Sequence, residues 1–173
     1  IIKWTRKLIS NLNKKKSIAF NRAAIVDTLY RPFVSYKVYY DVHLNEDLYQ
    51  LKELFRGADR NASICILEGK RLDFCAIATD LLPNYGLLSL DPIQIFGRYR
   101  IASDGSRIDN LTDWGLKQFQ AHYEKGEKPK RRITKDDIFH YVYGVLHDPV
   151  YRETYAINLK REFPRIPFNP DFW

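Results

Sequence analysis

The sequence contains no methionine and only two cysteines among its 173 residues. Because a translated chain begins with methionine, we expect this one to be a piece of a larger polypeptide. Cys65 and Cys75 both lie in apolar segments, which favours buried thiols in a reducing compartment over a disulfide. Two cysteines do not supply the ligands of a structural zinc site, so no metal is expected.

Long apolar runs are also missing. The run "SICIL" at residues 63–67 is far shorter than the roughly 20 residues that a membrane-spanning helix needs, and the first ten residues lack the layout of a signal peptide. We therefore expect no membrane contact and a cytoplasmic location. A hydrophobic fraction of 45% with 14% aromatic residues is ample for a packed core, and the length suits one domain over residues 1–173.

Acidic residues are scarce in two segments of a chain whose net charge is +7. Residues 3–22 carry seven basic residues and no acid, and the run "KGEKPKRR" at residues 125–132 has Glu127 as its one acid. Blocks of positive charge suit a polyanion such as nucleic acid. The alternative is an ordinary solvated face, which each run taken alone favours.

Hydrophobic periodicity predicts an α+β fold: an N-terminal helix, a central, mostly antiparallel sheet and a C-terminal segment of about three helices. Thr134 with Asp137 predicts a capping box, and Asp148 followed by Pro149 predicts a helix start. Gly97 is a candidate bend in its strand. The predicted helices cover residues 4–13, 21–30, 111–123, 134–148 and 149–163, and residues 46–56 are predicted as a helix or a loop. The predicted strands cover residues 17–20, 33–42, 92–102 and a hairpin at 62–80.

Two acidic residues and a lysine match the arrangement found in the active sites of metal-dependent nucleases. Asp59 precedes an apolar strand that ends at Glu68, and Lys70 follows two residues later. In such enzymes two carboxylates hold a divalent ion while a lysine steadies the attacked phosphate. A Glu-Gly-Lys-Arg sequence is also an ordinary turn, and this is the reading we prefer.

The tail "NPDFW" is similar to the loop with which amino-methyltransferases hold a target base, except that Asp171 replaces a proline. Such a site also needs a glycine-rich loop for AdoMet upstream, and the sequence contains none. The residues alone therefore describe a basic module without catalytic residues and without a cofactor of its own.

Two stretches carry a resemblance to a known family. "DNLTDWGLKQFQAHY", followed by "ITKDDIFHYVYGVLHDPVYRETYAINLKREFPRIPF", closely resembles the C-terminal target-recognition domain of Type ISP restriction-modification enzymes and related bacterial helicase-methylase polypeptides. "KWTRKL" and "LYRPFVSYKVYYD" near the start fit the same family. Gly97 in "IFGRYR" stands where the family has proline, so the alignment of residues 80–109 is not fixed.

The resemblance implies that catalysis and DNA recognition belong to different domains of one enzyme. Enzymes of this family join a nuclease, an ATP-driven translocase, an N6-adenine methyltransferase and a terminal module that reads duplex DNA. AdoMet, ATP and Mg²⁺ would then belong to the parent enzyme, and the partners of this chain would be double-stranded DNA and the methyltransferase domain of the same bacterial polypeptide. The competing interpretation is a protein-docking module whose aromatic helices contact other domains and no DNA.

Site residues follow from the expected DNA contacts. Arginine holds guanine O6 and N7 together, while any well-placed cation contacts phosphate. Arg31 in "YRPF" is expected to form a buried, structural ion pair with an acidic residue. The candidates for base contacts are Arg56, Arg60, Lys70, Arg71, Arg98, Arg100 and Arg107, and those for phosphate contacts are Lys14, Lys15, Lys16, Lys128, Lys130, Arg131 and Arg132.

Overall fold

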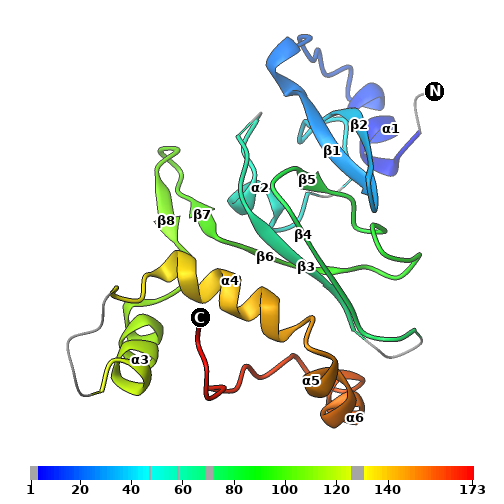
Figure 1. The fold of residues 1–173 in the computed structure, drawn as a ribbon. Coiled ribbons are helices and arrows are strands. Elements are labelled where there is room, and N and C mark those ends of the chain that lie inside the picture. The colour runs from blue at the N-terminus through cyan, green and yellow to red at the C-terminus, as the bar shows by residue number, and fades with distance from the viewer. Residues whose placement is uncertain (1–3, 47, 58, 69–71, 126–130) are drawn as a thin grey trace.

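The computed structural model describes residues 4–46, 48–57, 59–68, 72–125 and 131–173 (Figure 1). The described helices are α1 (Arg6–Asn13), a 3-10 turn η1 (Arg22–Ala24), α2 (Leu51–Leu54), α3 (Asp113–Tyr123), α4 (Lys135–Val145), α5 (Pro149–Thr154) and α6 (Ala156–Leu159). The described strands are β1 (Ile25–Arg31), β2 (Val34–Tyr39), β3 (Ser63–Leu67), β4 (Cys75–Thr79), β5 (Leu82–Pro83), β6 (Gln94–Gly97), β7 (Tyr99–Ile101) and β8 (Arg107–Asp109).

The strands form three small sheets rather than one. The first has the order β2-β1-β5, with β1 and β2 antiparallel and β5 parallel to β1. The second has the order β4-β3-β6 and is antiparallel throughout, and the third is the β7–β8 hairpin. With helices following the strands, the predicted α+β class and the largely antiparallel pairing are confirmed.

The strand β3 lies at the centre of the core because all five of its residues are buried. Ile64 and Ile66 face a cluster formed with α4, α5 and α6, whereas Cys65 and Leu67 face a second cluster on the other side. The helices therefore cover one face of the β4-β3-β6 sheet, as Figure 1 shows. Residues from β1 and from the segment between β4 and β6 cover the opposite face.

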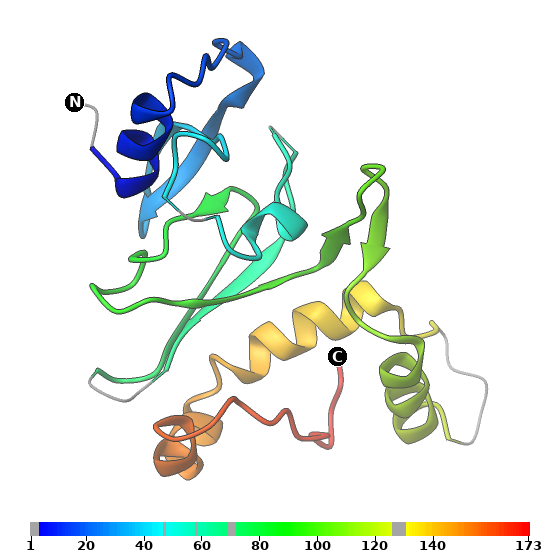
Figure 2. The ribbon, with the colours of Figure 1, turned by 180° about the vertical axis from the view of Figure 1, so that it is seen from behind.

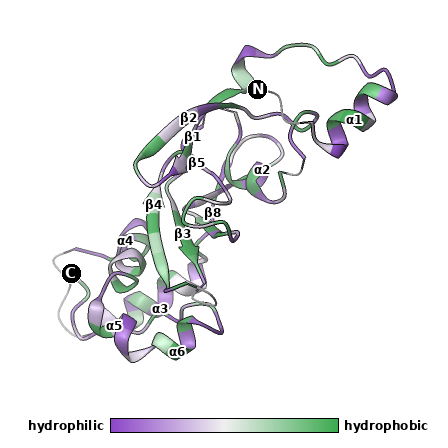
Figure 3. Ribbon diagram, turned by 90° about the vertical axis from the view of Figure 1, so that its right-hand side faces the viewer, coloured by the Kyte–Doolittle hydropathy of each residue, from purple (hydrophilic) through white to green (hydrophobic). Residues whose placement is uncertain are grey.

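The helix α1 lies at the end of the molecule remote from α3–α6 (Figure 3). Thr5 caps its first turn by accepting a hydrogen bond from the Leu8 amide, and Leu8 is buried. Asn11 Nδ2 donates to the His43 carbonyl at 2.9 Å, which ties the helix to the segment after β2. Three other apolar side chains of this region, Trp4, Ile9 and Leu12, are exposed.

The structure corrects the prediction for residues 17–30. No strand occurs at residues 17–20, and the predicted helix at 21–30 is a single 3-10 turn followed by β1. Asn21 caps that turn as expected, since its side chain accepts from the Ala23 amide. Strand β1 forms because its β-branched residues alternate between the core and the solvent, with Val26 and Thr28 buried.

The C-terminal helices begin where the sequence predicts. Thr134 and Asp137 form a reciprocal capping box at α4, and Asp148 caps α5 ahead of Pro149. The tail then returns across α4, because the Tyr141 hydroxyl donates to the Pro167 carbonyl at 2.7 Å and accepts from the Asn169 amide at 2.8 Å. None of the helices in the described ranges is long and apolar enough to cross a membrane.

Candidate nucleic-acid interface

The β7–β8 hairpin projects from the end of β6, next to the loop that precedes β3 (Figure 2). Two arginines connect these segments. Arg56 Nη1 donates to the Ser103 carbonyl at 2.9 Å, and Arg107 Nη2 donates to the Arg60 carbonyl at 3.0 Å. Arg56, Arg60 and Arg107, which we call the arginine cluster, are exposed; the first two lie in the loop before β3 and the third lies in β8.

The arginine cluster is partly neutralised by acids. Arg60 Nη1 lies 2.9 Å from Asp80 Oδ2, and this hydrogen bond raises the pKa of Arg60. Hydrogen bonds from Ser106 lower the pKa of Asp104 at the hairpin tip, and the charge of Arg56 adds to the effect. Arg56 and Arg107 donate to backbone carbonyl oxygens. A carbonyl carries no formal charge, so these hydrogen bonds do not neutralise either guanidinium.

The remaining candidates for base contacts are placed differently. Arg100 pairs with Ile108 across the hairpin, whereas Arg107 pairs with Ile101. Because neighbouring strand residues point to opposite faces, Arg100 lies on the other face of the hairpin from Arg107. Lys70 and Arg71 lie outside the described residues.

Arg98 is buried, unlike the other described candidates. Its side chain is 7% exposed, and its guanidinium bonds to Asp109 and Asp136, each at 2.5 Å. Burial opposes the charge, but the bonds with the two carboxylates outweigh it and raise the pKa of Arg98. A base contact by Arg98 would require these ion pairs to break, so its geometry fits a structural role.

The candidates for phosphate contacts form two separate groups. Lys14, Lys15 and Lys16 are exposed directly after α1, and Lys15 has a left-handed backbone with φ of 52°. Arg131 and Arg132 are exposed ahead of α4, where Arg131 pairs with Asp137 and lies over the Trp173 ring. Lys128 and Lys130 are outside the described residues.

The geometry does not support the nuclease trio. Asp59 precedes β3 and Glu68 follows it, so the two carboxylates lie at opposite ends of a five-residue strand, which rises about 3.3 Å per residue. No group of three or more histidine, cysteine or acidic residues that could hold a metal ion occurs among the described residues. Lys70 itself cannot be placed, since it lies outside that part of the chain.

Arg31 has a different partner from the acid that we expected. Its Nη1 donates to the Tyr30 carbonyl at 2.8 Å, and its guanidinium lies 4.2 Å from the centre of the Tyr30 ring.

Cys65 and Cys75 are free thiols, and burial raises the pKa of Cys65 to about 12. A thiol with so high a pKa is a poor nucleophile at neutral pH.

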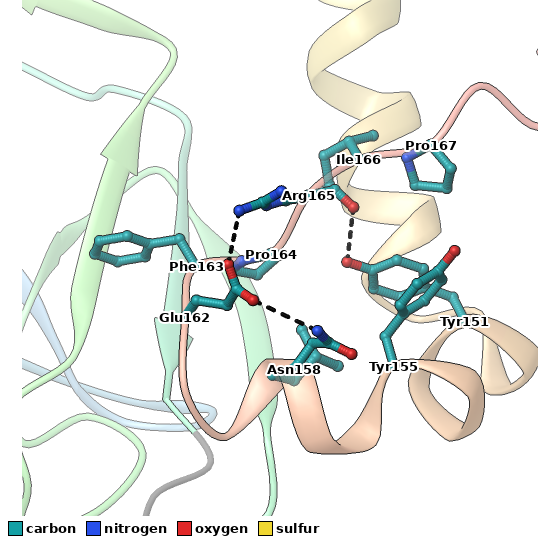
Figure 4. Close-up of a pocket in the computed structure, with 10 residues that line it drawn as sticks. Tyr151, Tyr155, Asn158, Glu162, Phe163, Pro164, Arg165, Ile166 and Pro167 are labelled. Carbon is teal, nitrogen blue, oxygen red and sulfur yellow. Dashed lines mark hydrogen bonds and ion pairs between the residues drawn. The ribbon is translucent and has the colours of Figure 1, made fainter.

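A cavity of about 320 Å³ lies between α5, α6 and the segment that follows them (Figure 4). The polar groups of its lining bond to one another. Arg165 Nη2 lies 2.9 Å from Glu162 Oε2, and the Tyr151 hydroxyl donates to the Arg165 carbonyl at 3.0 Å. These bonds fix the turn of the chain after α6, so we assign the cavity to the fold rather than to a reaction.

The aromatic residues of the C-terminal helices pack mostly against one another. Phe119, Tyr123 and Tyr141 meet Phe168 and Phe172 of the tail, with the Tyr141 and Phe172 rings stacked at 4.9 Å. Large apolar side chains are exposed at both ends of the molecule: Trp4, ahead of α1, is 65% exposed, and Trp114 on α3 is 72% exposed. The surface available for docking another domain thus includes the opposite end of the molecule from these helices.

One residue that holds the β7–β8 hairpin against α2 cannot be identified from the sequence. Asn61 is 2% exposed; its Nδ2 donates to the Leu54 and Tyr99 carbonyls, and its Oδ1 accepts from the Tyr99 amide at 3.2 Å. The side chain therefore joins β7 to the end of α2 in the manner of a paired strand. A single asparagine in a polar loop gives no indication of such burial.

Comparisons with known proteins agree on one family. The model of the Type ISP C-terminal specificity domain matches residues 1–173. The structure titled "cryoEM structure DrdV-DNA complex" is 43% identical, covers 97% of this chain and 16% of that chain, and has a TM-score of 0.86. A nuclease-deletion mutant of the Type ISP restriction-modification enzyme LlaGI with a DNA substrate mimic is 28% identical, covers 95% of this chain and 14% of that one, and has a TM-score of 0.73.

A further structure shares the fold. The ATP-dependent Type ISP restriction-modification enzyme LlaBIII bound to DNA is 22% identical, covers 96% of this chain and 11% of that one, and has a TM-score of 0.77. The chain therefore spans a small part of the length of each of these proteins. The comparison with curated proteins gave no match.

Proposed function

The chain belongs to the family of Type ISP C-terminal specificity domains, and from this premise we propose that it recognises a specific sequence in double-stranded DNA. The observation that carries the proposal is the arginine cluster on the projecting hairpin and the neighbouring loop. Arg56 and Arg107 are held at the surface with charged guanidinium groups, which suits bidentate contacts with guanine in the major groove. The DNA-bound structures of similar chains support the same role.

We assign the contacts by position. Arg56, Arg60 and Arg107 are proposed to contact base edges, with Arg100 reaching the DNA from the other face of the hairpin. Lys14, Lys15, Lys16, Arg131 and Arg132 are proposed to contact phosphates, which positions the duplex without reading it. Lys70, Arg71, Lys128 and Lys130 remain proposals of the sequence alone.

The wider role is also a proposal. We infer that the chain presents its DNA site to an N6-adenine methyltransferase domain of the same polypeptide in the bacterial cytoplasm, and that it is not itself catalytic. The exposed Trp4 ahead of α1, with Ile9 and Leu12 on the helix, supports contact with another domain. AdoMet, ATP and Mg²⁺ would be bound elsewhere in the parent enzyme.

Selection from a randomised pool of DNA duplexes tests the function. The full-length protein is incubated with the pool at near-physiological salt, and the retained duplexes are sequenced over several rounds. A short enriched motif is the expected result. Failure to enrich any motif with folded protein would contradict sequence recognition by this chain.

Arginine variants then test the assignment. Arg56→Ala and Arg107→Ala should each weaken binding to the enriched motif by about 1–3 kcal/mol, with relaxed preference at one base pair. Arg161→Ala is the matched control because it removes an exposed arginine after α6, away from the hairpin. If the cluster variants bind the motif as tightly as the control does, the arginine cluster is not the reading surface.

A further inference from the structure

We propose that Arg98 is a positioning residue for sequence recognition: it fixes the β7–β8 hairpin, and with it Arg107, relative to α3 and α4. The inference rests on the proposed function, because it concerns how the same surface is held in its reading geometry. The sequence alone favours Arg98 as a base contact, and its burial is what changes the assignment.

Arg98 lies at the point where the chain leaves the central sheet. It separates β6 from β7, its amide donates to the Ala62 carbonyl at 2.6 Å, and its carbonyl accepts from the Asn110 amide at 3.2 Å. The backbone of this residue is therefore bonded on both sides. The direction in which the hairpin leaves the sheet is set at this junction.

The side chain of Arg98 extends the junction to the helices. Its Nη1 donates to Asp109 at the end of β8, and its Nε donates to Asp136 in the first turn of α4. Asp109 is also bonded by Lys135 Nζ at 3.1 Å, and Lys135 reaches Asp113 of α3 at 2.6 Å. One buried guanidinium thus begins a chain of ion pairs that joins the hairpin to the first turns of both helices.

A stacked ring connects this network to the arginine cluster. The Arg98 guanidinium lies 4.4 Å from the centre of the Tyr99 ring, and the Arg107 guanidinium lies 5.5 Å from the same centre. Arg107 in turn donates to the Arg60 carbonyl. The orientation of an exposed candidate for base reading therefore depends on a ring that the buried arginine holds.

The energetics favour a positioning role over a purely stabilising one. Removing an arginine from water costs much of what its ion pairs return, so such networks contribute little net stability while fixing one arrangement. Only a planar guanidinium bonds two carboxylates through separate nitrogens and stacks on a ring at once, and lysine does not reproduce this. Arg98→Lys therefore keeps the charge and removes the geometry.

The test compares selectivity with general DNA affinity in the full-length protein. The probes are a duplex carrying the motif enriched by the wild type and a duplex of scrambled sequence. For Arg98→Lys we expect the ratio of the two affinities to fall at least tenfold. Affinity for the scrambled duplex and its salt dependence should stay unchanged, because Arg98 is buried and its guanidinium bonds to Asp109 and Asp136.

Two further variants make the result decisive. Asp136→Asn weakens the same network at a side chain that is 62% exposed, and it decides the question if Arg98→Lys does not fold. Arg152→Lys is the matched control, since Arg152 is a partly buried arginine that bonds to the Leu146 carbonyl and lies over the Phe74 ring. The control should lose no selectivity.

Each outcome separates the inference from the function on which it rests. A wild type that enriches no motif would overturn the proposed function itself. A selective wild type with equally selective Arg98→Lys or Asp136→Asn variants would overturn only the positioning role, as would a reduced salt slope, which would show that Arg98 contacts phosphate. In Arg107→Ala the effect of Arg98→Lys should largely disappear, because the side chain that it orients has been removed.

Discussion

A Cβ atom at Gly97 would lie 2.9 Å from each of three atoms: Asn61 Nδ2, Leu54 Cδ2 and Tyr99 O. Two of these belong to the bonds that join β7 to α2, so they cannot move without breaking buried hydrogen bonds. We expect Gly97→Ala to lower the free energy of unfolding by about 1–3 kcal/mol, the usual cost of overpacking. Urea unfolding followed by circular dichroism measures the change.

Gly144 is the natural control for Gly97. It lies within α4, where an added Cβ would meet no atom within 4 Å. Because alanine favours the helix over glycine, Gly144→Ala should raise the free energy of unfolding by up to about 1 kcal/mol. The two substitutions are chemically the same and should differ in sign, so equal effects would contradict the packing seen at Gly97.

The network around Arg98 gives the stability a pH dependence. The hydrogen bond from Arg98 lowers the pKa of Asp109 below its ordinary value of 3.8; burial opposes this effect and Lys135 adds to it. A carboxyl with a lowered folded-state pKa stabilises the fold above its unfolded-state pKa, and the contribution is lost as the pH falls through the folded-state pKa. The contribution is small, since Asp109 is 39% exposed.

Urea midpoints measured between about pH 2.5 and pH 6 test this prediction. The wild type should lose stability below about pH 4 more steeply than Asp109→Asn, which cannot titrate at this position. Glu153→Gln, an exposed carboxylate on α5, serves as the control and should follow the wild type. Parallel curves for the wild type and Asp109→Asn would show that the bond from Arg98 does not shift the titration.

At the scale of elements, the lysines after α1 should contribute to the salt dependence of DNA affinity. Lys14, Lys15 and Lys16 are exposed next to one another, and each real phosphate contact contributes about −0.9 to the slope of log K against log salt. Replacing all three by glutamine should flatten that slope measurably. Replacing Lys117 on α3 together with Lys160 and Arg161 directly after α6 makes the same charge change elsewhere, and it should leave the slope nearer to that of the wild type.

Elements with strong local signals were predictable from the sequence. The β3–β4 hairpin lies within the predicted range, and α4 and α5 begin at the predicted caps, because their patterns depend on neighbouring residues. The helix that the sequence predicts at residues 21–30 is wrong because the pairing of β1 with β2 and β5 is a tertiary contact. The sequence predicts a bend at Gly97, but it does not predict the new sheet that follows.

The candidate site was predictable only as a set of charges. Composition and resemblance selected the arginines, yet nothing local distinguishes the buried Arg98 from the exposed Arg100 two residues later. The difference arises from Asp109 and Asp136, which approach Arg98 through the return of β8 and the first turn of α4. Long-range contacts of this kind have no signature in one sequence.

At the scale of the whole molecule, the shared strand β3 connects the parts. Its two faces belong to different core clusters, one with the C-terminal helices and one with the segment around Leu87. Opening either cluster therefore exposes the other. We propose that residues 1–173 unfold as one cooperative unit.

Cys65 allows this proposal to be tested directly. Its side chain is 0% exposed in the middle of β3, so its thiol reacts with a labelling reagent only when the centre opens. In a Cys75→Ser background, urea curves from thiol reactivity and from circular dichroism should coincide. Two separate transitions would show that the N-terminal part and the helical part unfold independently.

Within the described part of the chain, the β7–β8 hairpin forms a sheet of its own and pairs with no strand of the other two sheets. Its tip at residues 102–106 is exposed apart from the partly covered Ala102. Exposed side chains of the hairpin, such as Arg100 and Arg107, can therefore be substituted while every strand pairing of the other two sheets stays in place. The same separation would allow a lineage to change its target sequence by a few substitutions without first redesigning the scaffold.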